Sequence, residues 1–139
     1  MTNSEAINIQ IISKIMAVFP SIQFTAQEDI ETIARPAFKL ILDEIKSERY
    51  ASEYVRRTYP VKLVYFAADK ERPKIECLTI FEQLEPTLYD MTDKISSIIY
   101  STDAVLEISF DVADTILVPA PTGDTGEDIE TLDLMEELN

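Results

Sequence analysis

The run of residues 54–66, Tyr-Val-Arg-Arg-Thr-Tyr-Pro-Val-Lys-Leu-Val-Tyr-Phe, constrains the fold of this 139-residue chain more than any other stretch. It is rich in β-branched and aromatic residues, which predicts a strand. Side chains of a strand alternate between its two faces, and here one face is mostly apolar while the other begins with Arg56 and ends with Phe66. We therefore expect a strand that enters the core near Phe66 and leaves it near Tyr54.

The length of this run supports the same interpretation. Thirteen extended residues span about 43 Å, whereas a compact domain of this size has a diameter of about 37 Å. Pro60 cannot donate a hydrogen bond to a ladder and is expected at an edge or a bulge. We interpret residues 61–66 as the part that holds the sheet and residues 54–59 as the part that extends outside it.

The residue types that are missing exclude several functional classes. The chain has no histidine, which excludes Ser-His-Asp and Cys-His nucleophiles and imidazole-based zinc sites. Its two glycines, at 123 and 126, exclude a glycine-rich phosphate loop. Residues 124–128 lack the spacing of a calcium loop, and acidic pairs such as Glu82 and Glu85 arise by chance among 26 acids. We predict no catalytic, cofactor or metal site.

Charge and hydropathy limit the partners and the compartment. The net charge of −14 argues against tight binding to a phosphate backbone. No apolar run approaches the roughly 18 residues of a membrane span, and the N-terminus lacks the basic region of a signal peptide. The single cysteine, Cys77, cannot form an internal disulfide, which fits assembly in a reducing cytoplasm.

Periodicity predicts two main helices. The first covers residues 2–19, with Thr2 and Glu5 at capping-box spacing, although its isoleucines also alternate like a strand. The second begins at Pro73 and contains Pro86, where we expect a kink or a break. Its apolar stripe should lie on the sheet, with Cys77 buried beside it, and it consists of Ile75, Leu78, Phe81, Leu84, Leu88, Met91 and Ile95.

The strands complete an α+β domain over residues 1–118. Besides 54–66 we expect strands at 22–25, 37–46, 97–100 and 105–112, with 115–118 extending the last pairing. The expected fold is a mixed, largely antiparallel sheet of four to five strands with the two helices packed on it. Residues 37–46 and 54–66 would form a long, protruding β-hairpin whose wide tip is the polar segment 47–53.

The hairpin tip is the first candidate contact surface. It carries many charged side chains, and these fit either a solvated loop with weak ion pairs or a subunit contact. The residues that we assign to a subunit or tube interface are Glu48, Arg49, Tyr50, Glu53, Tyr54, Arg56, Arg57 and Tyr59.

The C-terminal segment 119–139 differs in composition from the rest. Its first eight residues read as a linker, and its seven acids and absence of bases account for −7 of the −14, which leaves −7 for residues 1–118. It is either a frayed tail or a segment that orders against a neighbouring subunit. The apolar residues that would dock are Ile129, Leu132, Met135 and Leu138.

Several short motifs, in their order along the chain, resemble the small tail-terminator family of tailed phages, prophages and phage-tail-like particles of Gram-positive bacteria. After a leading helix they are Arg35-Pro-Ala-Phe38, Glu48-Arg-Tyr50, Arg56-Arg-Thr-Tyr-Pro60 with Val64-Tyr-Phe66, Glu76-Cys77, Asp103-Ala-Val-Leu106 and Met135-Glu-Glu-Leu138. Many relatives have Asp-Gly where this chain has Asp103-Ala104.

The resemblance implies a structural, non-enzymatic role. Such proteins form a hexameric ring that caps the tail tube, stops its polymerisation and offers a surface to the neck and head. The partners would be other copies of the chain, the tube protein, sheath and head–tail connector proteins, with DNA only passing through the lumen and no membrane. The particle, a virion tail or a phage-tail-like particle, would assemble in the host cytoplasm. The alternatives are another head–tail connector or neck protein and, from a different class, an acidic DNA-mimic inhibitor.

Overall fold

The computed structural model describes residues 3–117 and contains two α-helices and one mixed sheet. The chain forms an α+β fold, as the sequence predicts. In chain order the elements are α1 (Asn3–Val18), β1 (Gln23–Phe24), the 3₁₀ turn η1 (Ile30–Thr32), β2 (Ala37–Ile41), β3 (Lys46–Ala51), β4 (Tyr54–Phe66), α2 (Pro73–Leu88), β5 (Ile95–Tyr100) and β6 (Val105–Leu117).

The chain divides into two compact units. Within the described residues, the first contains residues 3–46 and 58–113, and the second contains residues 47–57 and 114–117. The expected linker and acidic segment at 119–139 lie outside the described residues, as does the expected helix cap Thr2.

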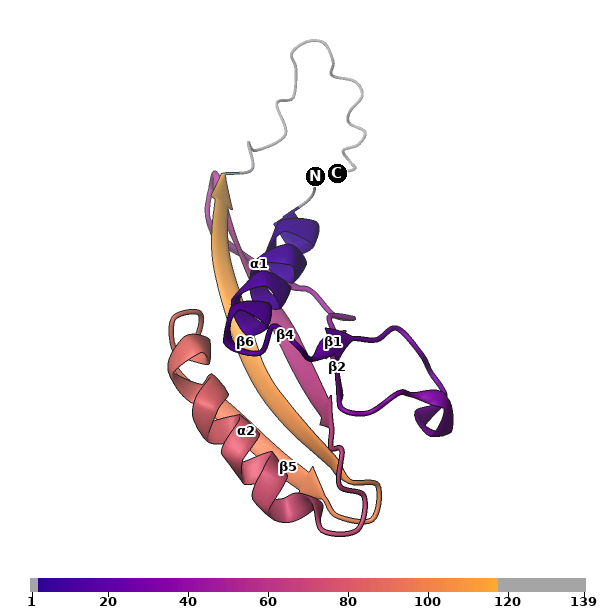
Figure 1. Ribbon diagram of the computed structural model, residues 1–139. Helices are drawn as coiled ribbons and strands as arrows, with labels where there is room; N and C mark the ends of the chain where they lie inside the picture. The colour runs from indigo at the N-terminus through magenta and orange to yellow at the C-terminus, as the bar shows by residue number, and fades with distance from the viewer. Residues whose placement is uncertain (1–2, 118–139) are drawn as a thin grey trace. The chain divides into compact units, whose positions relative to one another are not determined.

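The sheet has the strand order β1-β2-β4-β6-β5, and β3 also pairs with β4 (Figure 1). The β2–β4 and β5–β6 pairs are antiparallel, whereas β1 and β2 are parallel. The sheet is therefore mixed and largely antiparallel, as expected, but it has six strands rather than four to five. The additional strand arises because residues 37–46, expected as one strand, are divided between β2 and β3.

Pro60 accounts for this division. The β2–β4 ladder ends at the pair Ile41 and Lys62, and the same register would place Asp43 opposite Pro60. Because proline has no N–H, the ladder cannot continue there. β4 itself runs without interruption through Pro60. The break therefore falls in the segment that pairs with β4, between the end of β2 at Ile41 and the start of β3 at Lys46.

The hairpin tip also differs from the expectation. Residues 47–51 belong to β3, and a two-residue turn at Ser52 and Glu53 connects it to β4. The predicted wide loop over 47–53 is therefore wrong. Pairing with the start of β4 gives this polar stretch a strand conformation, although it lacks a glycine-containing hairpin signal.

Both helices cover the same face of the sheet (Figure 1). In α1 the residues Ile7, Ile11 and Ile15 recur at every fourth position and are buried, while Ile9 is 51% exposed. This four-residue spacing resolves the ambiguity between helix and strand in favour of the helix.

The buried face of α2 agrees with the predicted apolar stripe at its later positions, where Leu84 and Leu88 are buried and Phe81, Met91 and Ile95 pack against the core, but not at its start. Pro73 is its first residue and Cys77 is buried, as expected. Ile75 and Leu78, however, are 73% and 41% exposed, so these two positions of the predicted stripe are wrong. Two apolar rows overlap on this helix, and the sheet selects the row Pro73, Cys77, Ile80, Leu84 and Leu88.

Pro86 lies inside α2 without breaking it, because the helix continues for two more residues to Leu88. A proline near the end of a helix removes one late hydrogen bond instead of interrupting the centre. The prediction of a break at Pro86 is therefore wrong.

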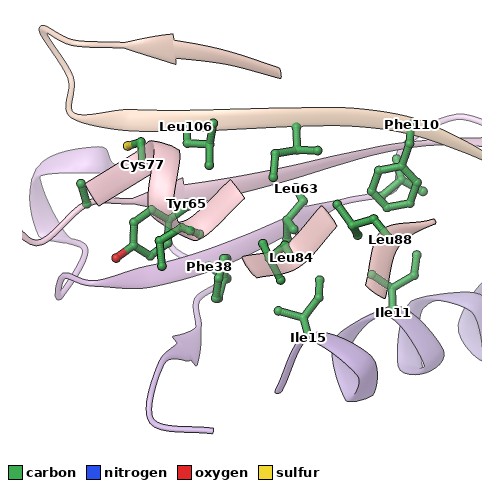
Figure 2. Close-up of a cluster of buried hydrophobic side chains, with 14 of the residues drawn as sticks. Ile11, Ile15, Phe38, Leu63, Tyr65, Cys77, Leu84, Leu88, Leu106 and Phe110 are labelled. Atoms are coloured by element: carbon green, nitrogen blue, oxygen red, sulfur yellow. The ribbon is translucent and has the colours of Figure 1, made fainter. Parts of the chain in front are cut away.

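The core lies between the helices and the sheet. Figure 2 shows Ile11 and Ile15 of α1 and Leu84 and Leu88 of α2 near side chains of the strands, including Leu63. At one end of this core, Phe38 packs against three other rings, with centroid separations of 5.1–5.8 Å, a range in which aromatic pairs attract one another. Those rings belong to Phe19, Phe24 and Tyr65.

Arg35 connects three segments that are distant in sequence. Its guanidinium donates hydrogen bonds to the carbonyl oxygens of Ala67 (3.1 Å), Ala104 (2.8 Å) and Asp103 (2.8 Å). It also lies 5.6 Å from the centroid of the Phe66 ring, within the range of a cation–π contact. The entry to β2 is thereby joined to the end of β4 and to the turn that precedes β6.

The turn before β6 contains a strained alanine. Ala104 has φ 56°, in the left-handed region that favours glycine. It is buried, its N–H donates to the Ser101 carbonyl, and its own carbonyl accepts from the Ala67 N–H as well as from Arg35. These bonds hold a conformation that the side chain disfavours.

Glu76 fixes the connection between β4 and α2. Its carboxylate accepts hydrogen bonds from the Tyr65 hydroxyl (2.5 Å) and from the N–H groups of Ala68 (2.7 Å) and Asp69 (3.0 Å). Burial opposes the charge of Glu76, but the three donors outweigh it and hold its pKa below the ordinary value. Burial and the bond to this carboxylate raise the pKa of Tyr65.

We predict that Arg35→Ala lowers the free energy of unfolding by about 2–4 kcal/mol, because it leaves three carbonyl groups without a charged donor. Urea unfolding measures the change. The matched control is Arg72→Ala, whose exposed side chain has no partner among residues 3–117 and should cost no more than about 0.5 kcal/mol. Equal effects of the two variants would contradict the assignment.

We predict that Glu76→Gln destabilises the protein by about 1–3 kcal/mol at pH 7 and that the difference from the wild type shrinks in acid. The folded pKa of Glu76 lies below its ordinary value of 4.5. Its contribution is therefore fully present above that value and is lost as the pH falls through the folded pKa. Unfolding curves from pH 7 to pH 3 test this, with Glu82→Gln on the exposed side of α2 as control. A difference that stays constant over this range would refute the linkage.

Candidate subunit interface

The strand β3 presents an exposed polar surface. All six of its residues, Lys46–Ala51, are exposed. The Arg49 guanidinium donates a hydrogen bond to the Ser52 carbonyl oxygen (3.0 Å), which supports the two-residue turn from the β3 side. Alternation along the strand gives it no apolar face, since its residues are Lys-Ser-Glu-Arg-Tyr-Ala.

Seven of the eight residues predicted as interface have side chains at the surface. Tyr50 and Tyr54 are 68% and 43% exposed. Arg57 is half-buried. The exposed members of the set are Glu48, Arg49, Tyr50, Glu53, Tyr54 and Arg56.

Tyr59 differs from the other seven because it is buried, with 0% exposure. Strand alternation places it on the same side of β4 as Val61 and Leu63, and it belongs to the main hydrophobic cluster. The side chain of Tyr59 therefore offers no surface to a neighbour in this structure, and its role is in the core.

The charged side chains of the tip are not paired with one another. Within residues 3–117, Glu48, Glu53, Arg56 and Arg57 take part in no hydrogen bond or ion pair through their side chains. The expectation of cross-strand ion pairs around the tip is therefore not met. Unpaired arginines beside exposed tyrosines are typical of residues that become anchors when a partner binds.

The sheet face that the helices leave free carries an ion pair. Lys62 Nζ on β4 lies 2.7 Å from Glu107 Oε2 on β6. The hydrogen bond to Glu107 raises the pKa of Lys62, and a hydrogen bond to the same carboxylate raises the pKa of Tyr100. Ile98, opposite Glu107 in the β5–β6 register, is 55% exposed. This face is solvated and partly apolar.

A shallow hollow of about 230 Å³ lies beside Pro60, at the place where β2 stops pairing with β4. Apolar side chains such as Ile41 and Phe110 form part of its lining, and Asp43 and Asp111 add negative charge. Its shape follows from the missing ladder, because no strand covers β4 at that point. Such a hollow can receive a side chain of a partner but has no enclosed volume for a substrate.

No chemical centre accompanies these surfaces in the described part of the chain. Among residues 3–117, no three Cys, Asp or Glu side chains gather where they could hold a metal ion. No helix in that range is long and apolar enough to cross a membrane.

The chain matches the model of a known protein family. Residues 6–123 match the model of a phage tail terminator protein. The chain belongs to the phage tail terminator family. This match covers all six strands and both helices apart from the first residues of α1. No curated protein matches the chain at a significant level. The resemblance that the short motifs indicate is thereby confirmed.

Some important residues of this tail terminator have no distinct signal in the sequence. Arg35 and Glu76 occur in the motifs Arg35-Pro-Ala-Phe38 and Glu76-Cys77, but nothing local predicts their bonds to backbone groups far along the chain. The pair Lys62 and Glu107 depends on the neighbouring positions of β4 and β6. Opposite charge on two predicted strands is the only signal available for it.

We predict that Tyr59→Ala lowers the free energy of unfolding by about 3–5 kcal/mol, because it empties a buried site. Tyr50→Ala, at an exposed position, should change it by no more than about 0.5 kcal/mol. Thermal and urea unfolding of the two variants compare a core tyrosine with a surface tyrosine of the same hairpin. A fully stable Tyr59→Ala variant would contradict the burial of this ring.

Proposed function

We propose that this phage tail terminator assembles into a hexameric ring that caps the tail tube, ends its polymerisation and offers the attachment surface for the neck and head. The family match over residues 6–123 carries this proposal, because it covers nearly the whole described chain. The partners would be further copies of the chain, the tube protein and, in contractile tails, the sheath, with head–tail connector proteins on the other side. The product would be part of a virion tail or a phage-tail-like particle.

The exposed hairpin residues support a role in ring contacts. A cyclic ring uses heterologous contacts, in which one patch of a subunit meets a different patch of the next. Arg56 and Arg57 have no partner among residues 3–117 and are available for such a contact. Together with Glu48, Arg49, Tyr50, Glu53 and Tyr54 they form the surface that we propose to meet a neighbouring subunit or the tube.

The charge of the chain supports passage of DNA rather than binding of DNA. Each phosphate contact made by a lysine or arginine strengthens binding, so basic residues around a lumen would retard the genome. The net charge of −14 fits a lumen that avoids such contacts. We propose that the protein is not an enzyme, because the family that it matches implies a structural role.

Two alternatives have different consequences. A head–tail connector would share the ring, but its loss would leave tails of normal length without heads, whereas loss of a terminator gives overlong tubes. An acidic DNA-mimic inhibitor would compete with DNA for a nuclease and needs carboxylates on a rigid surface. Residues 1–118 combine 19 acids with all 12 bases of the chain, a mixture less suited to imitating a phosphate backbone, which favours the terminator.

We predict that Arg57→Glu prevents ring formation or tube capping while the subunit stays folded, because it reverses an unpaired charge at the proposed contact. Native mass measurement of the wild type and electron microscopy of tails provide the readouts, with circular dichroism for folding. The control is Lys94→Glu, the same charge change at an exposed position outside the hairpin.

The outcomes test the role of Arg57 and the formation of the ring separately. Normal rings and normal tube length with Arg57→Glu would remove Arg57 from the interface. A wild-type chain that stays monomeric at high concentration, and forms no hexamer on tubes, would overturn the ring itself.

A further inference from the structure

An apolar pair with basic neighbours lies on the exposed side of α2. Ile75 and Leu78 are 73% and 41% exposed. Lys74 precedes Ile75 in the helix, and Lys70 and Arg72 lie in the segment that leads into it. We define this α2 patch as Lys70, Arg72, Lys74, Ile75 and Leu78.

Helix geometry brings the members of the α2 patch together. Ile75 and Leu78 are three residues apart, and Lys74 and Leu78 are four apart, so both pairs are neighbours on the helix surface. The side chains of Lys70, Arg72 and Lys74 form no hydrogen bond or ion pair with any residue of the range 3–117. Their charges are therefore available to a partner.

Nearby acids neutralise this charge only in part. Glu71 is exposed between Lys70 and Arg72, and Glu31 and Asp103 line the same shallow hollow as Lys70. Glu76 is occupied by the Tyr65 hydroxyl and two backbone N–H groups, and Asp69 accepts from the N–H groups of Glu71 and Arg72. Arg72 and Lys74, beside Ile75 and Leu78, are therefore the basic groups best placed to attract an acidic partner, whereas Glu82 and Glu85 beyond Leu78 would repel it.

The same chain contains a segment with the complementary composition. Residues 124–139 hold seven acids and no base, and they include apolar residues at every third position, Ile129, Leu132, Met135 and Leu138. The match to the family model covers residues 6–123, so this segment follows the matched region. Acidic and apolar residues in alternation match a surface that is basic and apolar.

We propose that residues 124–139 of one copy bind the α2 patch of a neighbouring copy. Apolar residues of the segment cover Ile75 and Leu78, while its carboxylates face the three basic side chains. The inference rests on the proposed ring, which places copies next to one another. The partner that occupies the α2 patch is therefore a segment of this same chain rather than a separate protein.

Chain length permits this contact between copies. The twelve residues from Leu117 to Ile129 can span at most about 40 Å, comparable with the diameter of about 37 Å expected of one subunit. Exposed ion pairs are individually weak, but the segment is tethered in the ring. Tethering gives it a high local concentration, so a weak contact becomes populated.

The test uses the full-length chain with a photoreactive benzoylphenylalanine in place of Met135. Rings are prepared from a mixture of ¹⁴N- and ¹⁵N-labelled subunits, irradiated, and the crosslinked peptides are identified by mass spectrometry. We expect heavy–light crosslinks to residues 70–78. The double variant Arg72→Glu, Lys74→Glu should lower their yield about tenfold, and salt at about 1 M should lower it as well. The matched control is Lys94→Glu, which should leave the yield unchanged.

Each other result overturns the inference. Crosslinks to residues outside the α2 patch, crosslinks only within one label, or a yield that the charge reversals do not change would each exclude this contact. Native mass measurement of the same samples keeps the two proposals apart. Intact rings without these crosslinks refute only the docking of residues 124–139, whereas a chain that forms no ring refutes the proposed function.

Discussion

The missing N–H of Pro60 is the constraint around which the sheet is arranged. It ends the β2–β4 ladder near Ile41, separates β2 from β3 and leaves the hollow beside Asp43 uncovered. β4 tolerates the proline because a strand needs no hydrogen bond on both sides of every residue. One residue thereby allows a single long strand to serve the buried sheet at one end and an exposed hairpin at the other.

The surfaces of the protein divide its acids and bases unevenly. Arg56 at the hairpin and the bases at the start of α2 have no side-chain partners within residues 3–117, whereas the acids with clear structural roles, Glu76 and Glu107, are engaged. A chain with a net charge of −14 can use these unpaired bases for specific contacts, because each lies in a field of opposite charge. Such contacts are attractive between copies even though the copies repel one another overall.

The sequence predicts the parts of the fold that depend on local pattern. The helix at α1, the start of α2 at Pro73 and the strand at 54–66 follow from spacing and from proline chemistry. The choice between Ile75 and Cys77 for the buried side of α2 does not, because both lie in apolar rows and the sheet decides between them. The sequence predicts Tyr59 as an interface residue, but its burial depends on which face of β4 the helices cover, and no local pattern decides that. The bonds of Arg35 and Glu76 require distant backbone groups and have no local pattern.

The backbone of Ala104 makes position 104 depend on position 35, which lies almost seventy residues earlier in the chain. Left-handed conformations cost an alanine on the order of 1 kcal/mol, and Arg35 helps to hold this one by bonding to the carbonyl groups of Asp103 and Ala104. A homologue with glycine at position 104 does not have that cost and needs less stabilisation from the hydrogen bonds of Arg35. A homologue with a bulkier residue at position 104 needs those hydrogen bonds in full. The acceptable residues at positions 35 and 104 are therefore linked, and a change at one alters which changes the other can tolerate.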